Sequence, residues 1–243
     1  MNPKKLVFNP VDPIGIYIGC ILILAWFLSL AFLLNWDINY KNPLVYIAIY
    51  LQTHLYTGLF ITSHDAMHGT VSKDKHLNRL IGRITSILFA FNFYDSLIIK
   101  HHKHHKHVAT EHDPDYHESG HFWLWYWNFI KRYITLKQLI LMACCLLGLV
   151  LFFSLENLLL YWILPSILST FQLFYFGTYL PHRQGHDNSN KHHSRSLEKN
   201  HVWAFFSCYF FGYHYEHHDA PSIPWWRLWR TKESIKQVVL LKN

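Results

Sequence analysis

The sequence has few charged residues and few cysteines, and both shortages narrow its class. Charged residues make up 15% of the 243-residue chain, against 51% hydrophobic and 18% aromatic residues. The four cysteines lie in apolar segments without CxxC spacing, so we expect packing thiols and no disulfide framework. The net charge of +7 does not predict nucleic-acid binding, because the basic residues are scattered between apolar runs.

Four apolar runs are long enough to span a hydrocarbon core about 30 Å thick. They cover residues 14–34, 43–63, 139–155 and 158–180, and Pro165 interrupts the last. The runs 80–99, which carries charges, and 202–213, which is short, predict re-entrant or interfacial helices. The sequence therefore predicts an all-α integral membrane protein of about four transmembrane helices plus interfacial helices, in one domain over residues 1–243.

The distribution of Lys and Arg predicts the orientation of these spans. Lys4 and Lys5 precede the first span, and the positive-inside tendency places them in the cytoplasm. All the other Lys and Arg residues except Lys41 then lie on the cytoplasmic side or at its boundary. The same alternation brings every histidine cluster to that side, so we expect a multi-pass protein with a cytoplasmic N-terminus and a cytoplasmic active site.

Three histidine clusters have spacings that place imidazoles on one face of a helix. They are His64 with His68; His101 with His104 and His105; and His214 with His217 and His218. Clustered imidazoles are typical metal ligands, and eight are too many for one four-coordinate ion. The number favours two metal ions, and imidazole suits iron among the candidates. His182 and His186, four residues apart at the end of the fourth span, are candidates to complete the coordination.

Carboxylates close to these clusters can accept the second N–H of a ligating imidazole. The candidates are Asp65, Asp113, Asp115 and Glu216, with a helix cap, a turn or a solvated charge as the alternative for each. His54 lies ten residues before His64, about 15 Å away along a helix, which is too far for the same site. We expect it to make an interhelical bond or to line a tunnel.

The longer strings around the histidines resemble those of bacterial and cyanobacterial beta-carotene ketolases, in the membrane di-iron superfamily of desaturases and hydroxylases. The resemblance runs from about residue 12 to residue 230. It is carried by LFITSHDAMHG at 59–69, the histidines of 100–107 with Asp113-Pro114-Asp115, FGTYLPHR at 176–183, GYHYEHH at 212–218 and PSIPWWRL at 221–228. The doubled His101-His102 and the polar loop after His186 differ locally without touching these positions.

The resemblance implies a fatty-acid-desaturase-like domain acting as a beta-carotene 4-ketolase. Such an enzyme turns the ring C4 methylene of beta-carotene into a ketone, giving echinenone and then canthaxanthin, by two O2-dependent hydroxylations and a dehydration. Two Fe²⁺ ions, with no separate protein acid or base, are the implied catalytic centre. The chain has no GxGxxG motif, so electrons must come from an external donor. Similarity implies a ferredoxin-type donor, for which basic residues near the clusters offer a docking surface; lipid headgroups are the alternative contact.

Other readings of the same metal centre remain open. A carotenoid hydroxylase or a fatty acid desaturase or hydroxylase uses the same centre, and a non-catalytic metal-binding membrane protein is a remote alternative. Aromatic residues are candidate walls of a tunnel for a carotenoid arriving from the bilayer, with ordinary packing as the alternative; they are Phe89, Phe91, Phe93, Phe174, Tyr175, Phe205, Phe206, Tyr209 and Phe210.

Overall fold

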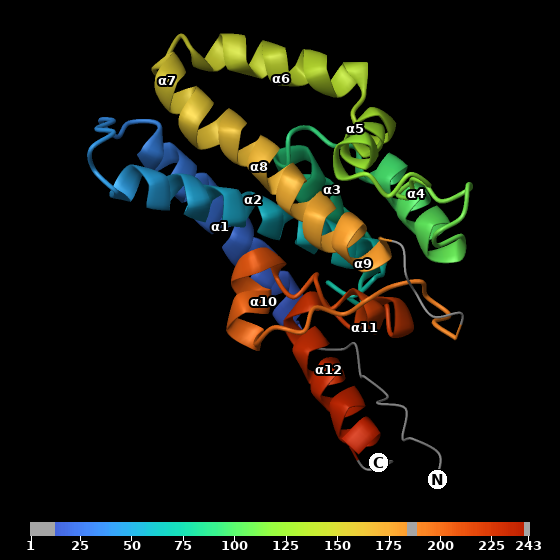
Figure 1. The fold of residues 1–243 in the computed structure, drawn as a ribbon. Helices are drawn as coiled ribbons and strands as arrows, with labels where there is room; N and C mark the ends of the chain where they lie inside the picture. The colour runs from blue at the N-terminus through green and yellow to red at the C-terminus, as the bar shows by residue number, and fades with distance from the viewer. Residues whose placement is uncertain (1–12, 184–188, 241–243) are drawn as a thin grey trace.

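The computed structural model describes residues 13–183 and 189–240 and is built from helices (Figure 1). Within these residues the only β pairing is an isolated bridge between Ser196 and Tyr213. The α-helices are α1 (Ile14–Leu33), α2 (Leu44–Met67), α3 (Lys75–Leu88), α4 (Tyr94–Lys106), α5 (Phe122–Tyr133), α6 (Leu136–Leu149), α7 (Leu155–Leu158), α8 (Leu164–Phe174), α9 (Leu180–His182), α10 (His201–Cys208), α11 (His214–Asp219) and α12 (Trp225–Leu240). The predicted all-α class is confirmed for the described residues.

Three helical segments are long and apolar enough to cross a membrane, namely α1, α2 and the rod Leu155–His182. The rod runs from α7 to α9 and contains two π turns, η1 (Leu159–Ile163) and η2 (Tyr175–Tyr179). Pro165 occupies the first turn of α8, directly after η1. The π turn accommodates the missing N–H of the proline, so the rod continues where the sequence suggested an interruption. The first, second and fourth predicted spans are confirmed as long apolar helices.

The third predicted span, 139–155, is not one long helix. α6 ends at Leu149 and has 14 residues, which extend about 21 Å and fall short of a full crossing. A break of two residues joins α6 to α5 at a bend of 83°. The pair α5 and α6 can supply a fourth, bent crossing, because both helices expose apolar side chains, such as Trp127 of α5 and Leu139 of α6.

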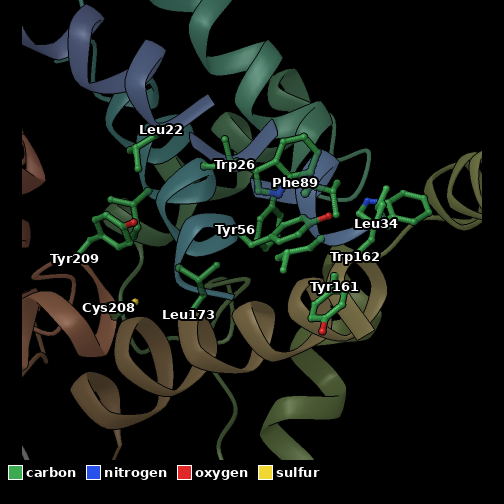
Figure 2. Packing of buried hydrophobic residues seen from close by; sticks show 14 of the residues in the cluster. Leu22, Trp26, Leu34, Tyr56, Phe89, Tyr161, Trp162, Leu173, Cys208 and Tyr209 are labelled. Atoms are coloured by element: carbon green, nitrogen blue, oxygen red, sulfur yellow. The ribbon is translucent and has the colours of Figure 1, made fainter. Parts of the chain in front are cut away.

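The core is packed around α2, which contacts α1, α3 and α8. Figure 2 shows Tyr56 of α2 close to Trp26 of α1 and to Phe89, which follows α3. The Tyr56 ring meets Trp26 edge-on at 5.3 Å and Phe89 at 6.2 Å between centroids. Aromatic pairs in this geometry stabilise beyond the apolar area they bury. This cluster fixes the position of α2, whose last turn carries the first histidine pair.

The segments 80–99 and 202–213 form short helices, as predicted. α3 and α4 pack against each other and against α2, and the turn between them includes Ala90 and Phe91 at positive φ. α10 spans eight residues and ends at Cys208, and Tyr209, which follows it, also has a positive φ. Positive φ is uncommon for residues other than glycine. These turns let short helices fold back against the bundle without crossing it.

Candidate metal centre

Four helices bring the predicted histidines to one end of the bundle. His64 lies in the last turn of α2, and His68 directly follows that helix. His101, His104 and His105 lie on α4, His182 ends the rod Leu155–His182, and His214, His217 and His218 lie on the six-residue helix α11. Residues separated by up to 154 positions thus meet at one site, where His64, His104, His182, His214, His217 and His218 are buried and the other three are partly buried. His186 lies outside the described residues.

The histidines form two neighbouring groups, in each of which the candidate ligand atoms all lie within 4.8 Å of one another. The first group is His64, His68, His101, His105 and His217. The second group is His104, His182, His214 and His218. The rings of His105 and His218 are 4.3 Å apart between centroids, so the two groups adjoin.

The spacing of the ring nitrogens fits metal binding. Nε2 of His105 lies 3.0 Å from Nε2 of His217, and Nε2 of His104 lies 3.2 Å from Nε2 of His218. Imidazole nitrogens bound roughly 2.0–2.1 Å from a zinc-sized ion at right angles are about 3 Å apart. Nε2 of His64 is buried with no hydrogen-bond partner among the described residues. A buried polar atom without a partner is costly, and a metal ion would satisfy it.

Burial keeps the imidazoles of α11 neutral and therefore able to bind a metal. Burial lowers the pKa of His214, His217 and His218 well below the usual value, and the neighbouring imidazoles lower it further. Burial also opposes protonation of His104, but Asp115 and Asp113 outweigh it and raise the pKa of His104. A neutral imidazole offers the lone pair that a metal requires.

Three of the four predicted carboxylates lie beside the histidines. Oδ1 of Asp113 is 2.9 Å from Nδ1 of His104, and Oδ2 of Asp115 is 3.8 Å from the same nitrogen. Oδ1 of Asp65 is 3.4 Å from Nδ1 of His64. Such contacts orient an imidazole and fix which nitrogen faces the metal. Glu216 instead faces Lys232 of α12, with Nζ 3.6 Å from Oε1.

Several contacts that support the site carry no signal in the sequence. The carbonyl of His193 accepts a hydrogen bond from Nδ1 of His182 at 2.8 Å, which turns Nε2 toward the second group. The backbone N–H of Trp225, at the start of α12, donates to Oδ2 of Asp65 at 2.9 Å. The Tyr133 hydroxyl donates to Asp115. α12 therefore contacts both the first and the third histidine clusters, through Asp65 and Glu216.

Two adjoining cavities lead to the histidines. An outer cavity of about 430 Å³ lies between α4, α5, α6 and α8 and is mostly apolar. Trp127, Leu139 and Ile167 line it and are more than half exposed, so it reaches an exposed apolar surface of the helices. An inner cavity of about 50 Å³ is lined by four of the histidines, which are His64, His101, His104 and His214. Both cavities share Phe60, Leu97, Phe129, Tyr133 and Leu173.

The aromatic residues proposed as tunnel walls are placed differently, with one exception. Phe89 lines the outer cavity. Phe174 is packed among Phe122, Trp125 and Tyr126, and Phe205 and Tyr209 stack around His54. For these residues the alternative of ordinary packing applies, because they face neighbouring helices and not the cavity. The His54 ring nitrogens have no hydrogen-bond partner in the described chain, so the predicted interhelical bond is absent there.

Comparison with known proteins identifies the family to which the chain belongs. The model described as "Fatty acid desaturase" matches residues 41–141 and 123–242. The chain belongs to the fatty acid desaturase family. Two relatives of this desaturase-family chain are each named "Beta-carotene ketolase", from Paracoccus sp. strain N81106 / MBIC 01143 and from Paracoccus sp. strain PC1. The first is 38% identical over 85% of this chain and 84% of its own length. The second is 36% identical over 88% of this chain and 90% of its own length.

The similarity extends to algae. A protein named "Zeaxanthin 4-ketolase" from Chlamydomonas reinhardtii is 35% identical over 88% of the desaturase-family chain and 50% of its own length. No solved structure matches the chain. The resemblance predicted from the histidine-containing strings is thereby confirmed.

Proposed function

We propose that the chain is a beta-carotene 4-ketolase, which oxidises the ring C4 methylene of a carotene to a ketone. The main support for this function is the outer cavity, which opens between lipid-facing residues and narrows onto the histidine groups. A carotene dissolves in the bilayer and can enter such a cavity without crossing water. The relatives named ketolases support the same substrate and reaction.

The two histidine groups would hold two Fe²⁺ ions. The first group offers five imidazoles and the second offers four, with His186 as a further candidate. Iron bound there would supply the activation of O2 that oxygenation of a C–H bond requires. Asp113 and Asp65 would hold His104 and His64 in the orientation that directs their other nitrogens inward.

The apolar cavity has two tasks in this reaction. Its residues would place one ring of the carotene at the neck formed by Phe60, Leu97 and Leu173. The same residues exclude water, which protects the reacting carbon from side reactions. Because C4 is allylic in beta-carotene, its C–H bond is weak, and orientation of that carbon decides the product.

Electrons would come from a ferredoxin-type carrier on the cytoplasmic side. Lys103 and Lys106 of α4 are exposed beside His104 and His105, two of the candidate metal ligands. An acidic carrier would be attracted to this positive surface, and its docking there would shorten the path to the metals. The predicted N-terminal contribution of Lys4 and Lys5 to the orientation lies outside the described residues.

Pigment analysis tests the proposed activity. A beta-carotene-producing bacterium that expresses the intact chain should accumulate echinenone and canthaxanthin, measured by liquid chromatography. A 3-hydroxylated carotenoid instead would contradict the position of oxidation and favour the carotenoid hydroxylase. Unchanged beta-carotene beside an iron-loaded protein would contradict the substrate class and direct attention to lipid desaturation.

Labelling tests the proposed orientation. Lys41 is exposed at the end of the bundle opposite the histidines, and Lys103 is exposed beside them. A Lys103→Cys variant should react with a membrane-impermeant maleimide only in inverted vesicles, and Lys41→Cys only in intact cells. The reverse pattern would place the metal centre on the outer side.

A further inference from the structure

Thr178 of η2 presents a polar group to the inner cavity. Its side chain is 4% exposed, and it lines this cavity together with His104 and His214. Among the described residues its hydroxyl makes no hydrogen bond. Its oxygen is not among the fully enclosed atoms without a partner, so it is open to a partner in the cavity. A hydroxyl at such a position normally bonds to water or a ligand. The position therefore calls for an explanation.

Other helical threonines show how this hydroxyl would ordinarily be satisfied. Their Oγ1 atoms donate to the carbonyl one turn earlier, as in Thr53, Thr57, Thr62, Thr85 and Thr170. Thr178 lies instead in a π turn, whose wider bonding pattern changes the distance to the preceding carbonyls. Single π turns in long helices are frequent at functional sites. Here Thr178 lines the inner cavity, and its hydroxyl makes no bond to a preceding carbonyl.

The other polar side chains of the inner cavity either belong to the two histidine groups or have partners. The Tyr133 hydroxyl donates to Asp115, and Oδ2 of Asp115 lies 3.8 Å from Nδ1 of His104. The imidazole nitrogens face one another in the two histidine groups. Outside the histidine groups, Thr178 is therefore the polar side chain of the described lining that is available to an oxygen atom of a substrate.

The sizes of the two cavities restrict which part of a substrate reaches Thr178. A single buried water needs roughly 10–15 Å³. The inner cavity of about 50 Å³ therefore accommodates small groups, whereas the outer cavity of about 430 Å³ can take an apolar ring. A ring held at the neck would extend only its reacting edge inward. A hydroxyl group on that edge would meet Thr178, whereas in the outer cavity it would face mostly apolar side chains.

We propose that Thr178 is a positioning residue, which hydrogen-bonds the hydroxyl that the first oxygenation places on the ring. The proposal rests on the proposed ketolase function. Each oxygenation consumes one O2, two electrons from the external carrier and two protons, converts C–H to C–OH and releases one water. A second oxygenation at the same carbon gives a geminal diol, which loses water and leaves the ketone. Holding the alcohol at the site favours this second step over release.

A Thr178→Val variant separates this role from general damage to the fold. Valine fills nearly the same space, and removal of an unpaired hydroxyl leaves no new buried group without a partner. In the beta-carotene-producing bacterium we expect the ratio of 4-hydroxylated to 4-keto carotenoids to rise about fivefold or more, as the loss of one hydrogen bond allows. Thr178→Ser should restore the ratio, because serine keeps the hydroxyl.

A matched control is Thr85→Val, which removes a buried hydroxyl that bonds to the Ile81 carbonyl away from both cavities. It should leave the product ratio unchanged. An unchanged ratio in Thr178→Val at normal protein and iron levels would overturn the proposal. So would an equal loss of the hydroxylated and keto products in that variant, because Thr178 would then act before the first oxygenation. Failure of the intact chain to oxygenate carotene would instead count against the ketolase function itself.

Discussion

Replacing His217 by alanine should abolish ketone formation and lower the iron content of the purified protein. Nε2 of His217 lies 3.0 Å from Nε2 of His105, and the His217 ring is 4.6 Å from that of His64. Loss of a residue that only supports a metal ligand lowers metal affinity or activity roughly 10–100-fold. Loss of a ligand itself should therefore lower the yield of ketone at least about a hundredfold. Liquid chromatography of the pigments and elemental analysis of the protein measure both effects.

His107→Ala is the matched control for this prediction. His107 follows α4, pairs with the His112 ring at 5.7 Å and belongs to neither histidine group. The variant should keep its iron and its products. Full iron loading together with normal echinenone in the His217→Ala protein would show that this imidazole is not a ligand, and the first histidine group would have to be reassigned.

Periodicity predicted the histidine clusters well but not their division between two groups. Adjacent residues on an α-helix point about 100° apart, so His104 and His105 of α4 enter different groups. Which group each joins depends on where α2, α9 and α11 sit around α4. That arrangement is set by packing between distant segments, and helical spacing within one cluster does not contain it.

The cavities were less predictable than the metal centre, for a similar reason. Aromatic content alone suggested nine tunnel walls, but only Phe89 lines the outer cavity. Most of the lining comes from residues of α5, α6 and α8, whose arrangement depends on the 83° bend after Tyr133. Hydropathy finds an apolar run at 139–155 but is insensitive to a bend before it. The third span differs from its prediction because α6 ends at Leu149, and the bend before α6 explains the missed cavity.

Replacing Gly177 by alanine should disturb the centre through packing alone. A Cβ at this position would lie 2.0 Å from Cε1 of Phe211, well inside van der Waals contact. The Phe211 ring packs against the rings of His64 at 4.9 Å and His214 at 5.1 Å between centroids. Alanine favours a helix by about 1 kcal/mol over glycine, but overpacking a buried site costs about 1–3 kcal/mol or more. Displacement of Phe211 should therefore lower ketone yield about tenfold or more and reduce the temperature of unfolding.

Two further variants separate this clash from a general effect of substituting a helical glycine. Gly148→Ala in α6 would place its Cβ in open space, so it should leave the unfolding temperature equal or higher. Phe211→Leu, combined with Gly177→Ala, should restore part of the lost activity, since the smaller side chain makes room for the new methyl group. If Gly177→Ala unfolds at the normal temperature and makes normal amounts of ketone, Phe211 moves without disturbing His64 and His214. If the double variant recovers activity, the close approach of η2 to Phe211 holds the imidazoles of α2 and α11 in place.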